Sequence, residues 1–394
     1  MEKLRISVEE HRQRQEKLLE ELDRRSLSGA CLFGNTAIKY LTGFNFIPTE
    51  RPMAFVLTKD EAVMYVPKLE EEHCLIGTAL DRSVSYPEYP GARHSIYTLK
   101  DLLIEMNLND KKIGVDSNGY PHIFGYEGPS LTDMLPKIET ENIAYYIVEM
   151  RMIKSENEIK LIKASSKWGD RVHELLQKYT VPGVSEIQVS MRASMEATRE
   201  MIETLGDKYV AMGGRGVSAG YRGQIGAHSA LPHSQTINAI FKPGDTLVTG
   251  AGGDLGGYHS ELERTMFVGE PSADQKKYFD LMYEAQQIAF EAIKPGEPYS
   301  VVDEAVREFF EINNLWDYWR HHQGHNIGLE GHEAPFFDIG DDSIMKPGMV
   351  VSVEPGIYIP GLGGFRHSDT GVITESGFEI VTHYPRELKD LICG

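Results

Sequence analysis

Residues 324–335 read GHNIGLEGHEAP, and residues 351–369 read VSVEPGIYIPGLGGFRHSD. In both stretches a histidine or a carboxylate stands beside glycine or proline within an otherwise apolar run. This pattern is typical of rigid strand ends and turns that present one polar group to a pocket. We therefore expect the two stretches to form walls of one functional site.

Two earlier stretches have the same character, IGAHSALPH at 225–233 and GYHSELERT at 257–265. In the second, Glu261 and Glu263 alternate with Leu262, so both carboxylates project from one face of a strand. Each stretch alone has an ordinary explanation, because a strand histidine is often structural and paired carboxylates often face solvent. The four stretches together indicate a site between about residues 225 and 370.

Toward the N-terminus, short apolar runs bounded by glycine, proline or charge predict buried strands of an α/β layer. They are Ala30–Phe33, Met53–Leu57, Ala62–Val66, Lys112–Asp116 and Ile143–Val148. A charged helix is expected before them, over the first 25 residues.

The composition changes near residue 150. Arg151–Ala164 predicts a helix with Ser155 as its N-cap and Glu158 three residues later, which is a capping box. Further helices are expected at Ser185–Leu205, Ala273–Ile293 and Val301–Asn313. We predict two domains, residues 1–150 and 151–394.

The composition excludes several classes of protein. Of 394 residues, 41% are hydrophobic and 25% charged, and no run is apolar enough to span a membrane. The net charge of −19 argues against binding nucleic acid. Three widely spaced cysteines and the lack of a secretory signal favour a cytoplasmic protein without disulfides.

The four stretches, in this order and spacing, resemble the pita-bread family of creatinase, prolidase and methionine aminopeptidase. The likeness covers essentially the whole chain and rests on LPH at 231–233, GHNIGLEGHEAP at 324–335, VEPGIYI at 353–359 and GGFRHSDT at 363–370. It implies an α/β (α+β) fold, with an N-terminal creatinase-type α/β domain followed by a C-terminal pita-bread catalytic domain.

The peptidases of this family hold two divalent metals with five ligands, two Asp, one His and two Glu. Carried onto this chain, these positions are Gly250, Glu261, His325, Glu354 and Ser368. Two of them therefore offer no ligand, and a dinuclear site needs bridging carboxylates. The resemblance leaves one possible metal set, a single ion on Glu261, His325 and Glu354.

Creatinase has the same fold and works without metal. At the position of Glu263, creatinase also carries Glu, whereas the peptidases carry Thr. The likeness implies catalytic roles for His233, Glu263 and Glu354, with His233 as general acid and base and the two glutamates holding a cationic substrate. A neutral imidazole suits such proton transfer. We therefore expect a metal-independent hydrolase, without a cofactor, that cleaves a C–N bond of a small amidine- or guanidine-like compound, as creatinase and the ectoine hydrolases do.

The residues expected to bind the substrate are His325, His332, Glu261 and Arg51. Arg51 matches a residue that reaches into the neighbouring subunit in creatinase, so we expect a homodimer with a small-molecule substrate. A covalent ester on Glu263 or Glu261 is chemically possible. Two alternatives stay open: a metal-dependent Xaa-Pro peptidase with a degenerate site holding a divalent metal such as Mn or Zn, and a non-catalytic pita-bread module that binds a protein.

Overall fold

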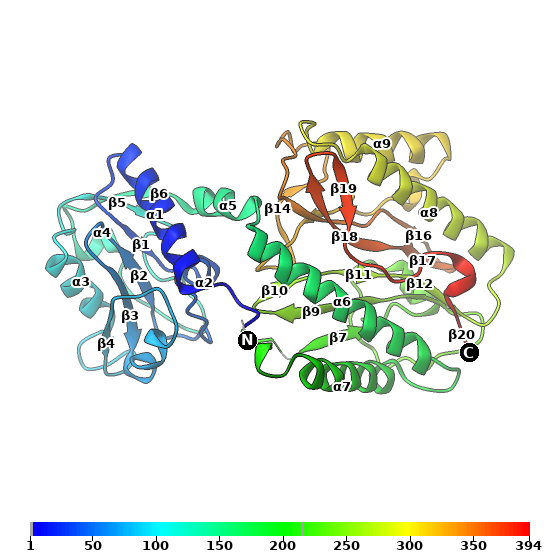
Figure 1. Cartoon of the computed structure of the whole chain (residues 1–394), viewed down its shortest axis with the longest axis horizontal. Coiled ribbons are helices and arrows are strands. Elements are labelled where there is room, and N and C mark those ends of the chain that lie inside the picture. Colours follow the sequence, from blue (N-terminus) through cyan, green and yellow to red (C-terminus); the bar gives the residue numbers. More distant parts are fainter. Residues whose placement is uncertain (1–2, 215) are drawn as a thin grey trace. The chain divides into compact units, whose positions relative to one another are not determined.

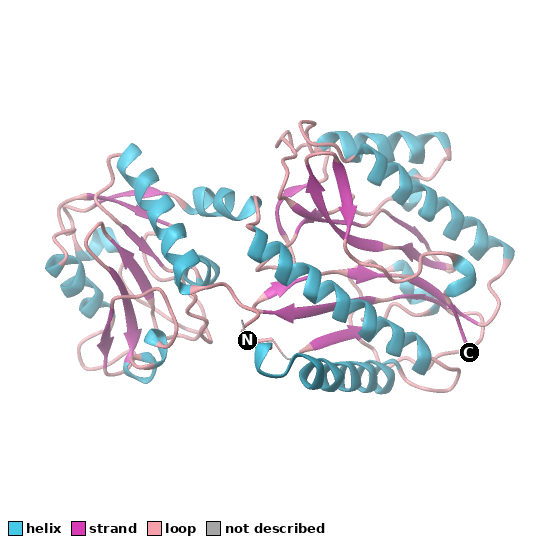
Figure 2. Cartoon of the chain, viewed as in Figure 1, coloured by secondary structure: helices cyan, strands magenta, loops and turns pink. Residues whose placement is uncertain are grey.

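The computed structural model describes residues 3–214 and 216–394, which form two compact units. The first unit is Ile6–Met150, and the second is Arg151–Gly394 with the chain up to Arg5. Each unit combines β-sheet with helices (Figures 1 and 2), which confirms the predicted α/β (α+β) class.

The N-terminal unit is built on a six-stranded sheet of order β4-β3-β2-β1-β5-β6. Its strands are β1 (Ala30–Leu32), β2 (Ala54–Leu57), β3 (Ala62–Pro67), β4 (Arg82–Tyr86), β5 (Lys112–Val115) and β6 (Glu139–Asn142). The pairs β1–β2 and β2–β3 are antiparallel, whereas β3–β4, β1–β5 and β5–β6 are parallel. Strands β1 to β3 are buried throughout, as their continuous apolar runs predict.

Helices accompany this sheet, and the predicted opening helix is confirmed. They are α1 (Val8–Arg24), α2 (Asn35–Thr42), α3 (Ile96–Glu105), α4 (Leu131–Met134) and α5 (Ala144–Met152). The expectation of a strand at Ile143–Val148 is wrong, because this run lies mostly in α5. Ile143 and Ile147 are buried four residues apart, which is helical spacing, and the Asn142 side chain accepts a hydrogen bond from the Ala144 N–H at the start of the helix.

The C-terminal unit is built on a nine-stranded sheet with the path β10-β9-β11-β18-β15-β13-β14, to which β7 and β19 are added. Two smaller sheets accompany it, β20-β12-β8 and β16-β17. The strands are β7 (Val217–Gly220), β8 (Thr246–Val248), β9 (Gly250–Leu255), β10 (Tyr258–His259), β11 (Leu262–Glu263), β12 (Thr265–Val268), β13 (His325–Asn326), β14 (Glu333–Phe336), β15 (Val350–Val353), β16 (Gly356–Ile359), β17 (Gly363–Arg366), β18 (Ser368–Thr374), β19 (Gly377–Ile380) and β20 (Ile392–Cys393).

The predicted long helices of this unit are confirmed as α6 (Glu156–Tyr179), α7 (Glu186–Leu205), α8 (Ala273–Ala292) and α9 (Ser300–Ile312). Helix α6 begins with the expected capping box of Ser155 and Glu158. Helix α6 packs against β9 and α7 against β7 (Figure 1). None of the described helices has both the length and the apolar character that a bilayer crossing requires.

The large sheet brings three of the four motif stretches together, and the fourth, at 225–233, packs through η4 (Gly226–Ala230) against β8, β16 and β17 of the smaller sheets. In register, Glu263 of β11 stands opposite Ser368 of β18, and Val353 of β15 stands opposite Asp369. A buried pair holds this junction, since the guanidinium of Arg264 donates to both oxygens of Asp369 at 2.7 and 3.2 Å. The backbone geometry therefore fixes where the candidate side chains project.

Candidate active site

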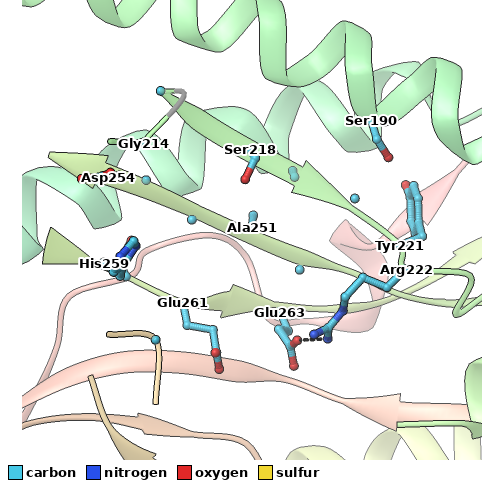
Figure 3. Close-up of a pocket in the computed structure, with 18 of the residues that line it drawn as sticks. Ser190, Gly214, Ser218, Tyr221, Arg222, Ala251, Asp254, His259, Glu261 and Glu263 are labelled. Carbon is cyan, nitrogen blue, oxygen red and sulfur yellow. Dashed lines mark hydrogen bonds and ion pairs between the residues drawn. The ribbon is translucent and has the colours of Figure 1, made fainter. Parts of the chain in front are cut away.

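A cavity of about 690 Å³ lies in the C-terminal unit beside β7, β9 and β11. Glu261, Glu263 and Arg222 lie along its wall, and Figure 3 shows both glutamates projecting from the same edge of the β11 segment. The glycines of β9, the strand paired with β11, line the same cavity. The sequence prediction that Glu261 and Glu263 share a face is confirmed.

Glu261, His325 and Glu354 converge next to this cavity. The Nε2 atom of His325 lies 3.2 Å from Glu354 Oε1 and 3.9 Å from Glu261 Oε2. Ser368 donates a hydrogen bond of 2.7 Å to the other oxygen of Glu261. Glu261 stands just before β11, His325 in β13 and Glu354 just after β15, so the sheet brings together side chains far apart in sequence.

Electrostatic coupling among these groups is strong. Burial, followed by the charge of Glu354, raises the pKa of Glu261 to about 7. Burial opposes the charging of His325, but the carboxylates of Glu354 and Glu261 raise its pKa to about 9. Burial also opposes ionisation of Glu354, yet contact with His325 keeps the pKa of that carboxyl well below its usual range. The cluster therefore concentrates negative charge around one imidazole.

The imidazole of His325 is oriented by its backbone contact. Its Nδ1 lies 2.9 Å from the carbonyl oxygen of Asn326, and because a carbonyl only accepts, Nδ1 carries the proton. Its Nε2 is buried and has no aligned hydrogen-bond partner in the described part of the chain. His332 is exposed and stacks on this ring at a centroid distance of 3.8 Å. Nε2 thus faces the two carboxylates of Glu261 and Glu354.

Glu263 is paired with two arginines. Arg366 donates to both of its oxygens, through Nε and through Nη2 at 2.8 Å, and Arg222 Nη2 donates at 2.6 Å. Glu263 and Arg366 are almost fully buried. Glu263 was expected to hold a cationic substrate. In the structure, however, two guanidinium groups already balance the charge of its carboxylate.

Two other predicted residues, His233 and Arg51, are not among these three converging side chains. His233 is exposed in the loop that follows the short helix η4 (Gly226–Ala230). Arg51 belongs to the N-terminal unit, where it donates to Glu88 at 2.7 Å and to Glu50 at 2.8 Å. The roles predicted for these two residues stay predictions.

Sequence reasoning missed Arg222 and Arg366. Arg366 stands inside the quoted stretch GGFRHSDT, and Arg222 stands between Tyr221 and Gly223 in a glycine-rich segment. A charged residue within an apolar or glycine-rich run was the available signal for both. Their common partner Glu263 becomes visible only in the folded chain.

One divalent ion fits the side chains present, whereas two do not. Ligand atoms of Glu261, His325 and His332 lie within 4.8 Å of one another, as do those of Glu261, Glu263 and Glu354, and carboxylates with imidazoles are suitable donors for zinc or manganese. A second ion would need carboxylates at Gly250 and Ser368, and neither residue supplies one.

Comparison with known proteins identifies two matching family profiles. Metallopeptidase family M24 matches residues 160–375, which is more than half of the chain. The creatinase/prolidase N-terminal domain matches residues 14–153.

Individual relatives are peptidases by name. The Xaa-Pro dipeptidase of Pyrococcus furiosus is 29% identical over 96% of this chain and 99% of its own length. The probable dipeptidase PepE of Mycobacterium tuberculosis is 36% identical over 65% of this chain and 64% of its own. The solved structure of the Xaa-Pro dipeptidase from Bacillus anthracis superposes with a TM-score of 0.81 at 26% identity, covering 97% of this chain and 99% of that chain.

These findings correct two expectations. The expected metal-independent hydrolase of a small amidine-like compound is wrong, because the matching profile is that of a metallopeptidase and the relatives are dipeptidases. The expected absence of a cofactor is wrong for the same reason, since the matching profile is that of a metallopeptidase. The resemblance to the pita-bread enzymes is confirmed: the chain belongs to metallopeptidase family M24.

Proposed function

We propose that this protein is a metal-dependent peptidase of the Xaa-Pro type that works with a single divalent ion held by Glu261, His325 and Glu354. The observation that carries the proposal is the convergence of these three side chains beside the cavity, with His325 Nε2 buried and unpartnered. The names of the relatives support a peptide substrate with proline after the cleaved bond.

The protein side chains have separable tasks. The carboxylates of Glu261 and Glu354 offset the charge of the ion, and the Nδ1 contact with Asn326 keeps His325 in the tautomer that binds through Nε2. A bound divalent ion supplies Lewis acidity and lowers the pKa of water. Ser368 holds one oxygen of Glu261 in place.

Two exposed histidines can carry the proton that the leaving nitrogen needs. Burial, and then the charge of His325, lower the pKa of His332, so its imidazole is neutral near pH 7. Both His332 and His233 are exposed. Either imidazole can accept a proton and return it to nitrogen.

Hydrolysis of short peptides tests the proposal. Protein stripped of metal and reloaded with Mn²⁺ or Zn²⁺ should cleave Xaa-Pro dipeptides faster than the matching Xaa-Ala dipeptides. His325→Ala should lose both ion binding and hydrolysis, because it removes the one neutral ligand. The control is His383→Ala, which changes an exposed histidine of the same unit. Lack of hydrolysis with either ion, in protein that remains folded, would count against the proposal.

We also propose residues 1–150 and 151–394 as the two domains. The two compact units support this division, because they separate between Met150 and Arg151. The ranges matched by the two family profiles, 14–153 and 160–375, support it as well. Separate expression of the two segments, each followed by thermal unfolding, tests whether each is an independent domain.

A further inference from the structure

Arg222 is the one lysine or arginine among the described residues that line the cavity. Its side chain is 47% exposed, and Figure 3 shows it reaching along the cavity wall to Glu263. Only Nη2 of its guanidinium is used, by Glu263 at 2.6 Å and Gln224 at 3.3 Å. In residues 3–214 and 216–394 no group accepts from its Nε or Nη1, so these donors remain for a ligand.

The neighbouring Arg366 differs from Arg222 both in its exposure and in how many of its donors are used. Its side chain is 3% exposed, and its guanidinium is used by Glu263, by the Tyr358 hydroxyl at 2.7 Å and by the Pro232 carbonyl at 3.4 Å. Arg366 therefore holds Glu263 in place. Arg222 is the cation that a ligand in the cavity can reach.

The guanidinium of Arg222 stands next to Gly250. A Cβ atom at Gly250 would lie 3.9 Å from Arg222 Nε and 3.7 Å from Glu263 Oε1, so the space in front of this glycine faces the arginine. This is the position at which the resemblance to the two-metal peptidases implies an aspartate ligand. A fixed positive charge thus stands beside the position where a ligand for a second ion is missing.

The backbone at Arg222 is held in an unusual conformation. Its φ of 49° lies in the left-handed region, which a long side chain rarely adopts and which concentrates at functional sites. The buried carboxylate of Glu186 fixes the turn by accepting hydrogen bonds from the N–H groups of Gly223, Ile237 and Ala239 at 2.8 to 3.1 Å. The strained turn directs Arg222 along the cavity wall.

Charge balance indicates what Arg222 binds. With His325 neutral as a ligand of the ion, the three carboxylates (Glu261, Glu263 and Glu354), the two guanidinium groups and a divalent ion sum to one net positive charge. We propose that Arg222 is a specificity-determining residue that binds a carboxylate group of the peptide substrate through Nε and Nη1. This inference rests on the proposed peptidase function, and a guanidinium fork matches a carboxylate in geometry and charge.

Ligand binding tests this role without turnover. The probe is an alanyl-proline analogue whose peptide carbonyl is reduced to a methylene group, compared as the free acid and as the C-terminal amide. Calorimetry on ion-free and Mn²⁺-loaded protein should show that the wild type prefers the acid by about ten- to a hundred-fold, as expected for a charge-assisted hydrogen bond. Arg222→Gln should reduce this preference to less than about threefold and leave Mn²⁺ affinity unchanged.

Two further variants separate charge from structure. Gly250→Asp places a carboxylate beside Arg222 and should also weaken the preference for the acid, although the arginine is retained. Arg199→Gln removes a largely exposed arginine of α7 and should leave the preference intact. An unchanged preference in Arg222→Gln, or equal binding of acid and amide by the wild type, would overturn the inference. Failure of Mn²⁺ to bind the wild type would instead refute the proposed metal-dependent function. The two outcomes are distinguishable, because the ratio of acid to amide affinity is also measured on ion-free protein.

Discussion

The pair of Arg264 and Asp369 should be a principal source of stability in the catalytic unit. Both side chains are fully buried, and Asp369 also accepts hydrogen bonds from Gln286 at 3.0 Å and Thr382 at 2.8 Å. Asp369→Asn would replace one acceptor oxygen by an NH₂ group and leave the charge of Arg264 without its counter-ion. Breaking a buried pair in this way costs about 3–5 kcal/mol.

The lower end of that range applies here. The Arg264 guanidinium keeps hydrogen bonds to the carbonyl groups of Glu263, Ser368, Tyr384 and Pro385, at 2.8 to 3.0 Å. A loss of about 3 kcal/mol corresponds to a fall in Tm of roughly 6–12 °C for a unit of this size. Scanning calorimetry, or circular dichroism during heating, measures this fall directly.

The exposed pair of Lys163 and Glu379 provides a matched control. Lys163 Nζ lies 2.7 Å from Glu379 Oε1, but the two side chains are 42% and 52% exposed. Exposed ion pairs of this kind contribute about 1 kcal/mol or less to the free energy of unfolding. Glu379→Gln should therefore shift Tm by no more than a few degrees. Equal Tm values for Asp369→Asn and Glu379→Gln would refute the reasoning from burial.

Three further predictions concern pH, packing and assembly. Burial raises the pKa of Asp170 from 3.8 to about 6. Between these pH values the folded state binds more protons than the unfolded state, so ionisation of Asp170 lowers the free energy of unfolding as pH rises. In urea unfolding, Asp170→Asn should therefore gain stability relative to wild type from pH 4 to pH 7. A Cβ at Gly364 would lie 2.0 Å from the Ser229 carbonyl oxygen, whereas Gly331 faces open space, so Gly364→Ala should lower Tm by several degrees and Gly331→Ala should not. The homodimer expected from the family resemblance should give twice the chain mass in light scattering, and a monomer at micromolar concentration would contradict it. If the Arg51 side chain reaches the partner subunit, Arg51→Ala should also impair activity.

Local signals in the sequence predicted much of the fold. The capping box at Ser155 and Glu158 marked the start of α6, and continuous apolar runs marked β1 to β3. The failure at Ile143–Val148 has a physical reason, because β-branched and aromatic residues favour strands only where the surroundings offer a sheet. Here the polar run Glu139–Asn142 pairs with β5, and the apolar residues form the buried face of a helix.

The site was predicted in part. The motif stretches identified Glu261, His325 and Glu354, which the sheet brings within 4 Å of one another through His325. The arginines were not foreseen, because their pairing with Glu263 joins segments that are distant in sequence. The expectation of no metal was wrong because the chain matches a metallopeptidase profile, whereas the missing ligands at Gly250 and Ser368 bear only on a second ion.

Anomalous X-ray diffraction from Mn²⁺-soaked crystals shows how many ions each chain binds and where they lie. The proposed single-ion site predicts one anomalous peak per chain, coordinated by Glu261, His325 and Glu354, and no peak in His325→Ala crystals treated in the same way. Two peaks per chain, or a single peak bound elsewhere, would contradict it.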